Sequence, residues 1–175
     1  MSLPTAHYRP LIAGCVFTTS LPFWRNWSPA VWLEALILQE SGGNHKAVRY
    51  ERHQDQAGRW DAGSDADTPD VDDGLLEDDK SYGLMQVMGY NARLWAGASG
   101  AMNFAVLLRP IANIACGLWI LVAELEATHQ NVARALARYN GGPTGDDLVD
   151  GEHMRRQVYV DGVASWAARV YREVP

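Results

Sequence analysis

Helix start and stop signals recur along the sequence, and they restrict this chain to a mainly α fold. The clearest run covers 31–41: it follows Ser28 and Pro29, an N-cap and a first-turn proline, and ends at Gly42 and Gly43. Further helices are predicted over 83–96, 110–129, 132–139 and 152–172. Apolar and charged residues alternate only briefly, so we expect at most a short β element, near 47–62.

The length and the charge of the chain limit how many domains it can form and which kinds of partner it can bind. With 175 residues it is long enough for a single domain, residues 1–175, and we place the core at 28–172. Ten acidic and three basic residues fall within 52–80, which is predicted to be an irregular acidic insert. The formal net charge of −6 argues against a nucleic-acid partner, because such binding depends on neutralising phosphates.

Neither a membrane span nor a metal site is expected. The uncharged stretches 94–108 and 111–123 are shorter than the ~20 apolar residues that a span needs, so we expect both in the core. No export signal is recognised near the N-terminus. Histidines and cysteines show no metal-ligand spacing, so no metal or cofactor is predicted. Cys15 and Cys116 are expected to be two buried thiols, with one long-range disulfide as the alternative.

Glu40 is the residue that most directly suggests chemistry. It follows Leu33, Leu36 and Ile37 at i, i+3, i+4 and i+7, so all four share one face of the predicted helix. A carboxyl on an apolar face is costly to bury as an ion, and burial favours its protonated form. A protonated carboxyl beside a flexible Gly-Gly pair suits a general acid. The alternative is a Glu at the helix end that turns outward to water.

Two other segments place polar groups at helix boundaries. Val132, Leu136 and Tyr139 share a face of their helix, which brings Tyr139 to the core boundary where Asn140 and two glycines follow. These polar groups at the core boundary could hold a large polar ligand, although Asn-Gly-Gly is also a common way for a helix to end. The segment 81–88 places small and polar residues and two methionines at a predicted helix entry.

Four short motifs occur in a fixed order: Glu-Ser-Gly-Gly-Asn at 40–44, Gly-Leu-Met-Gln at 83–86, Tyr-Asn-Gly-Gly at 139–142 and Tyr-Val at 159–160. In this the chain resembles the soluble lytic transglycosylase family, whose lysozyme-like domain is shared with goose-type lysozymes. The resemblance extends from about residue 28 to residue 171. In its compact size the chain resembles phage-encoded members of the family that serve as endolysins or virion lysins.

The resemblance implies a mainly α, lysozyme-like single domain that cleaves the β-1,4 bond between N-acetylmuramic acid and N-acetylglucosamine in peptidoglycan. Glu40 would be the lone catalytic acid/base, and the hydroxyl of Tyr159 would contact its carboxyl. The substrate-binding set carried over by motif also includes Ser41, which would order the turn after Glu40, and the residues Ser81, Met85, Gln86, Tyr139 and Asn140.

The acidic insert leaves the reaction type open. Hydrolysis generally uses two carboxyls, and goose-type lysozymes carry aspartates in the region that the insert would occupy. Asp55 and Asp61 are therefore possible second carboxylates. With Glu40 alone, the acetamido and C6 hydroxyl groups of the substrate would complete the reaction and leave a 1,6-anhydromuramic end. A true muramidase is the first alternative, and a catalytically silent peptidoglycan-binding protein is the second.

The remaining expectations concern assembly and delivery. We expect a monomer whose partner is the glycan strand of bacterial peptidoglycan. The site of action would be the cell wall in the periplasm. Because no export signal is recognised, we expect synthesis in the host cytoplasm and release by a holin, or carriage inside a virion.

Overall fold

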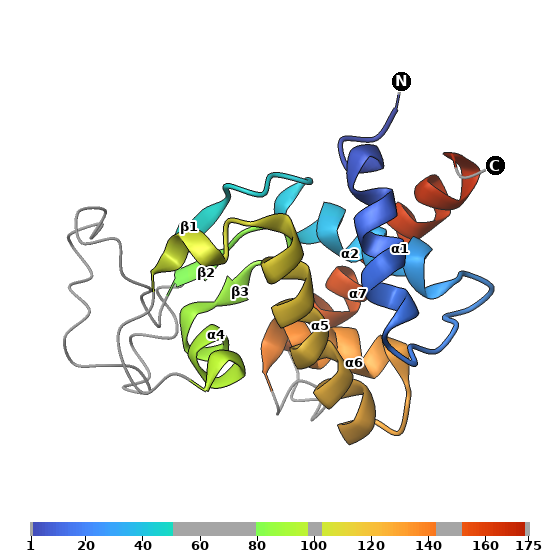
Figure 1. Cartoon of the computed structure of the whole chain (residues 1–175). Helices are drawn as coiled ribbons and strands as arrows, with labels where there is room; N and C mark the ends of the chain where they lie inside the picture. The colour runs from blue at the N-terminus through green and yellow to red at the C-terminus, as the bar shows by residue number, and fades with distance from the viewer. Residues whose placement is uncertain (1, 51–79, 98–102, 143–151, 174–175) are drawn as a thin grey trace. The chain divides into compact units, whose positions relative to one another are not determined.

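The computed structural model describes residues 2–50, 80–97, 103–142 and 152–173, and these are mainly helical (Figure 1). The helices and strands in chain order are η1 (Ala6–Tyr8), α1 (Arg9–Phe17), α2 (Pro29–Ser41), β1 (Val48–Tyr50), β2 (Lys80–Tyr82), β3 (Val87–Met88), α4 (Gly89–Ala96), η2 (Phe104–Val106), α5 (Pro110–Ala127), α6 (Val132–Gly141) and α7 (Glu152–Glu173). The mainly α class predicted from the sequence is confirmed.

Contacts between Cα atoms divide the chain into two compact units, which are described separately below. The first joins Met1–Gly43 to Leu118–Pro175, and the second is Asn44–Gly117. The organisation of the whole chain as one domain stays a prediction.

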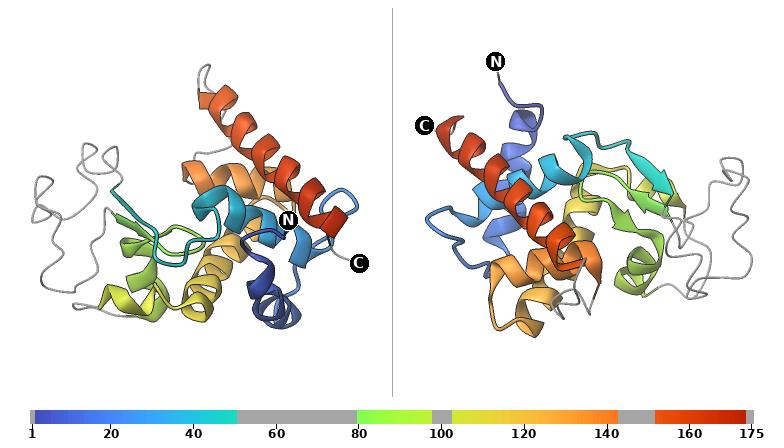
Figure 2. Two further views of the ribbon diagram at one scale, coloured as in Figure 1. Left: turned by 90° about the horizontal axis from the view of Figure 1, so that it is seen from above. Right: turned by 180° about the vertical axis from the view of Figure 1, so that it is seen from behind.

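Helix α2 is the centre of the first unit. Every residue from Val31 to Leu38 is buried, so this helix is covered on all its faces. Helices α1 and α7 both pack on α2, which lies between them in the view from above (Figure 2). The boundaries follow the predicted signals: Ser28 is extended, Pro29 opens the helix, and Gly42 ends it at φ +62°. The sequence predicted one buried face for this helix, whereas the structure buries all of its faces from Val31 to Leu38.

Helix α7 runs without a break through Gly162. The reason is a close approach between helices, since a methyl group at Gly162 would lie 2.7 Å from Oε1 of Gln39 in α2. The absent side chain lets the end of α2 and the middle of α7 approach one another. Helices α5 and α6 begin and end near the predicted residues.

The second unit contains a three-stranded antiparallel sheet in the order β1-β2-β3. Ser81 pairs with Met88 and Tyr82 with Val87, so residues 83–86 form the turn of a hairpin. The prediction of one helix over 83–96 is therefore wrong in its first half, and the β content exceeds the single short element expected. Backbone φ angles of +73° at Gly83 and +47° at Gln86 are incompatible with a continuous helix.

Two predictions about apolar segments also need correction. Leu94 is 53% exposed and Ile111 is 59% exposed, so 94–108 and 111–123 are not wholly buried core. Part of the first stretch lies outside the described residues. Among the described helices, α5 alone is long and apolar enough by composition to cross a membrane, a test that core helices also pass.

Two further features concern the N-terminal helices and the cysteines. No helix was predicted before residue 28, yet η1 and α1 are present. Ile12 is the one buried residue of α1, so its apolar periodicity is weak. Cys15 and Cys116 are both free thiols, which confirms that they are unpaired, but the predicted burial is correct for Cys116 and wrong for Cys15. Cys116 is fully buried, and burial raises its pKa to about 12, whereas Cys15 is partly exposed.

Candidate active site

Glu40 lies in the last turn of α2, at the edge of the buried part of that helix, and its side chain is partly exposed. Its carboxyl oxygen Oε1 accepts a hydrogen bond from the hydroxyl of Tyr159 in α7. The two residues are 119 positions apart in the sequence, and the packing of α7 on α2 brings them together. The predicted contact between these side chains is confirmed; the catalytic role of Glu40 stays a prediction.

Tyr159 is held as a neutral hydroxyl. Burial is the main cause that raises its pKa well above 10, and the nearby carboxyl of Glu40 adds to the effect, as does Tyr139. The hydroxyl therefore remains a hydrogen-bond donor through the neutral pH range. A carboxyl held at one oxygen by such a donor keeps a fixed orientation, which acid/base chemistry requires.

The turn after Glu40 is tied to α2 by Ser41. Its hydroxyl Oγ donates to the carbonyl of Ile37 at 3.2 Å and accepts from the backbone N–H of Gly43 at 3.2 Å. These bonds join the last turn of α2 to the backbone of the turn that follows it. Ser41 thus orders this turn, as its motif implies. A contact between Ser41 and a sugar stays a prediction.

Tyr139 and Asn140 lie near the end of α6, within the first unit. Tyr139 is partly exposed and Asn140 is exposed, so both can be reached by a ligand. Asn131 caps the start of the helix by accepting from the N–H of Arg134 at 3.1 Å. Nε of Arg138 is ion-paired with Glu124 of α5. This pair anchors the end of α6 that carries Tyr139 and Asn140.

In the hairpin turn of the second unit, the polar side chains form hydrogen bonds with groups of the hairpin itself. The Ser81 hydroxyl donates to Oε1 of Gln86 at 3.0 Å, and Nε2 of Gln86 donates to the carbonyl of Gly83 at 2.9 Å. Met85 is fully buried, and a methyl group at Gly117 would lie 2.5 Å from its sulfur. The structure therefore gives Met85 a packing role in place of the predicted groove-lining role. Sugar contacts of Ser81 and Gln86 stay predictions.

Asn113 and Glu34 are buried polar residues that the sequence analysis missed. Oδ1 of Asn113 accepts from the N–H of Met85 at 2.7 Å, and its Nδ2 donates to the carbonyl of Tyr82 at 2.7 Å. Glu34 is 2% exposed within α2. Each interrupts an otherwise apolar helical run, and that interruption is the signal that could have identified both residues.

Asp55 and Asp61, the possible second carboxylates, lie outside the described residues. Within 2–50, 80–97, 103–142 and 152–173, no cluster of three or more His, Cys, Asp or Glu residues could hold a metal ion.

Removing the hydroxyl of Tyr159 tests this arrangement. We expect Tyr159→Phe to lower turnover about 10- to 100-fold, because a hydrogen bond to a charged group contributes about 1.5–3 kcal/mol. The hydroxyl stabilises the ionised carboxyl more than the protonated one, so activity of the variant should persist to higher pH. Rates of cell-wall clearing across pH measure both effects. Wild-type turnover in a folded variant would contradict the assignment.

The same variant has a predicted signature in alkaline stability. The folded-state pKa of Tyr159 is raised above that of the unfolded chain, so its contribution to stability is present below pH 10 and is lost as the pH rises above 10. Urea unfolding at about pH 9 and about pH 11 should therefore show a smaller alkaline loss for Tyr159→Phe than for the wild type.

Comparison with known families adds an independent finding. The family model described as "Transglycosylase SLT domain" matches residues 24–155. This range contains Glu40, Ser41, Tyr139 and Asn140 and ends four residues before Tyr159. No curated protein matches the sequence.

Proposed function

Because this chain belongs to the transglycosylase SLT domain family, we propose that it cleaves peptidoglycan between N-acetylmuramic acid and N-acetylglucosamine and leaves 1,6-anhydromuramic ends. Members of this family are lytic transglycosylases that act on peptidoglycan. The observation that carries the proposal is the partly exposed Glu40 carboxyl, held at one oxygen by the buried hydroxyl of Tyr159.

The proposed reaction needs a single protein carboxyl. Protonated Glu40 donates its proton to the bridging oxygen as the bond from this oxygen to C1 of the muramic acid breaks. The acetamido group of the substrate stabilises the positive charge that develops at C1. The C6 hydroxyl then bonds to C1 and returns its proton to Glu40. No water is consumed, and the carboxyl is restored for the next turnover.

The second candidate is hydrolysis, which the acidic insert favours. An aspartate such as Asp55 or Asp61 would hold a water across the sugar from Glu40, and two such carboxyls lie roughly 6.5–9.5 Å apart in inverting enzymes. Like charges resist crowding, so this arrangement requires the ten acidic residues of 52–80 to be compensated by cations. Because of that cost, we favour the transglycosylase reaction over hydrolysis.

Mass spectrometry of digested sacculi decides between the two reactions. We expect most muropeptide ends to be 1,6-anhydro, each lighter by one water than a reducing end. Mainly reducing ends would instead support hydrolysis, and Asp55→Asn or Asp61→Asn should then suppress them. Undigested sacculi would support the catalytically silent, peptidoglycan-binding alternative.

The proposed setting is the bacterial cell wall. In this proposal the protein is a phage lysin that acts as a monomer in the periplasm, after release by a holin or delivery by a virion. Expression in a bacterial host should then cause lysis only when the inner membrane is permeabilised. Lysis without permeabilisation would contradict this delivery route and would leave the proposed reaction unaffected.

A further inference from the structure

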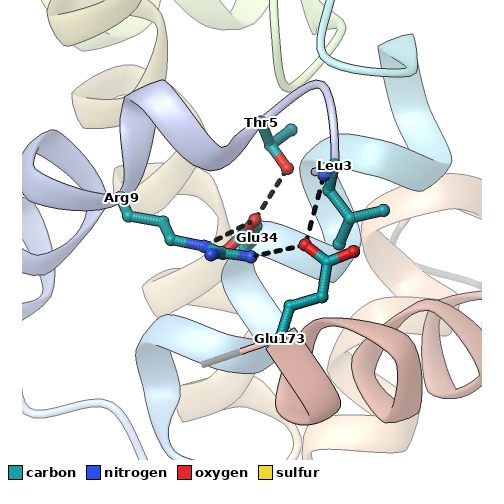
Figure 3. Close-up of polar contacts among 5 residues, drawn as sticks. All are labelled: Leu3, Thr5, Arg9, Glu34 and Glu173. Atoms are coloured by element: carbon teal, nitrogen blue, oxygen red, sulfur yellow. Dashed lines mark hydrogen bonds and ion pairs between the residues drawn. The ribbon is translucent and has the colours of Figure 1, made fainter. Parts of the chain in front are cut away.

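A buried carboxylate lies on the same helix as Glu40. The side chain of Glu34, six residues earlier in α2, is 3% exposed. Its Oε1 accepts from the hydroxyl of Thr5 at 2.7 Å, and its Oε2 accepts from Nε of Arg9 at 2.9 Å (Figure 3). The hydrogen bond to Glu34 is the main cause that raises the pKa of Arg9. The desolvated charge of Glu34 is thus compensated by the N-terminal segment.

The same arginine reaches the end of α7. Nη2 of Arg9 lies 3.4 Å from Oε2 of Glu173, and this oxygen also accepts from the backbone N–H of Leu3 at 3.1 Å (Figure 3). We call these five residues, Leu3, Thr5, Arg9, Glu34 and Glu173, the Glu34 clamp. Glu34 is the one member that lies within the family-matched range 24–155. Segments on either side of that range supply the other four.

The clamp gives α2 and α7 a second point of attachment. Glu40 and Tyr159 form the first. At a rise of 1.5 Å per residue, the two points are about 9 Å apart along α2 and about 21 Å apart along α7. The two helices also pack directly on one another, with Gly162 against Gln39. A second polar attachment, distant from the Glu40–Tyr159 contact, adds a further restraint on their crossing angle.

The N-terminal segment also supports the turn that follows Glu40. A methyl group at Gly43 would lie 3.0 Å from Cγ2 of Thr5 and 3.5 Å from Cβ of Pro4. Thr5 of the clamp and the neighbouring Pro4 therefore pack against the chain just beyond the candidate acid.

We propose that Arg9 is a positioning residue, which ties α2 to the end of α7 and thereby holds Glu40 against Tyr159. The inference rests on the proposed function for its catalytic consequence. It predicts that the clamp affects the chemical step more than substrate binding, because it sets the orientation of the acid and touches no substrate.

Glu173→Gln is the most selective test. Glu173 is 31% exposed, so this change weakens the α7 attachment while leaving the buried Arg9–Glu34 pair in place. On soluble glycan strands we expect kcat to fall about tenfold with KM changed less than about twofold. Arg172→Gln is the matched control, since it alters an exposed charge at the same end of α7 and leaves the clamp intact. We expect the kcat and KM of this control to match those of the wild type.

Arg9 itself is tested with two variants. Arg9→Ala leaves Glu34 buried without its cation and is expected to unfold more easily. The pair of changes Arg9→Met and Glu34→Gln removes both charges together, while the amide oxygen at position 34 can still accept from the buried hydroxyl of Thr5. We expect this double variant to fold and to show the same fall in kcat. Arg9→Lys keeps the positive charge, so we expect it to retain part of the wild-type kcat.

A readout independent of activity separates this inference from the proposed function. Tyrosine labelled with ¹³C at Cζ reports hydrogen bonding of its hydroxyl, and Tyr159→Phe identifies the resonance. We expect the Tyr159 resonance to shift in Glu173→Gln and in the double variant. If the wild type cleaves no peptidoglycan, the proposed function fails and this resonance alone decides the clamp. Wild-type kcat with an unchanged resonance in both folded variants, or a rate loss that only follows the unfolded fraction, overturns the inference.

Discussion

Replacing Glu40 by Gln is expected to lower the rate of peptidoglycan cleavage by at least ~10²–10⁴-fold, the contribution of general acid catalysis. The amide has the shape of the carboxyl but cannot release a proton. It can still accept a hydrogen bond from Tyr159, so the contact between α2 and α7 should survive. Clearing of permeabilised cells, followed as turbidity, measures the rate.

Glu126→Gln is the matched control for this experiment. Glu126 is an exposed carboxylate on α5, so its replacement makes the same chemical change away from the site. We expect wild-type clearing from this variant. Near wild-type clearing by a well-folded Glu40→Gln protein would show that Glu40 is not the acid.

Gly83→Ala should produce the largest loss of stability, about 2–5 kcal/mol. Gly83 opens the hairpin turn with φ +73°, which costs an L residue about 1–2 kcal/mol. The added methyl group would also lie 2.5 Å from the carbonyl oxygen of Leu107 and 2.4 Å from Nδ2 of Asn113. A backbone oxygen cannot move aside cheaply, so the turn itself must shift. Urea unfolding of the whole chain measures the change in free energy.

Gly97→Ala separates the two contributions. Gly97 has a similar φ of +61° after α4, but a methyl group there would meet nothing within 4 Å. We expect this control to lose about 1–2 kcal/mol, the cost of the backbone conformation alone. Equal losses in the two variants would contradict the steric argument about Leu107 and Asn113.

The structure also relates the hairpin turn to its motif. The segment 81–88, which contains Gly-Leu-Met-Gln, was interpreted from the sequence as a helix entry, because it has small and polar residues beside two methionines. The turn forms instead because Asn113, 28 residues beyond Met85, bonds the backbone on both sides of Gly83. Local propensity cannot reveal a partner that far along the chain.

Local signals along the sequence determined most helix boundaries and the choice of Glu40 as the candidate acid. Capping residues, prolines and glycines act within a few positions, so their effect can be deduced from the residues alone. The tertiary structure decided which side chains meet: Tyr159 with Glu40, Arg138 with Glu124, and Arg9 with Glu34 and Glu173. These pairs depend on how the helices pack, because burial of a charge is tolerated only where folding brings a partner to it.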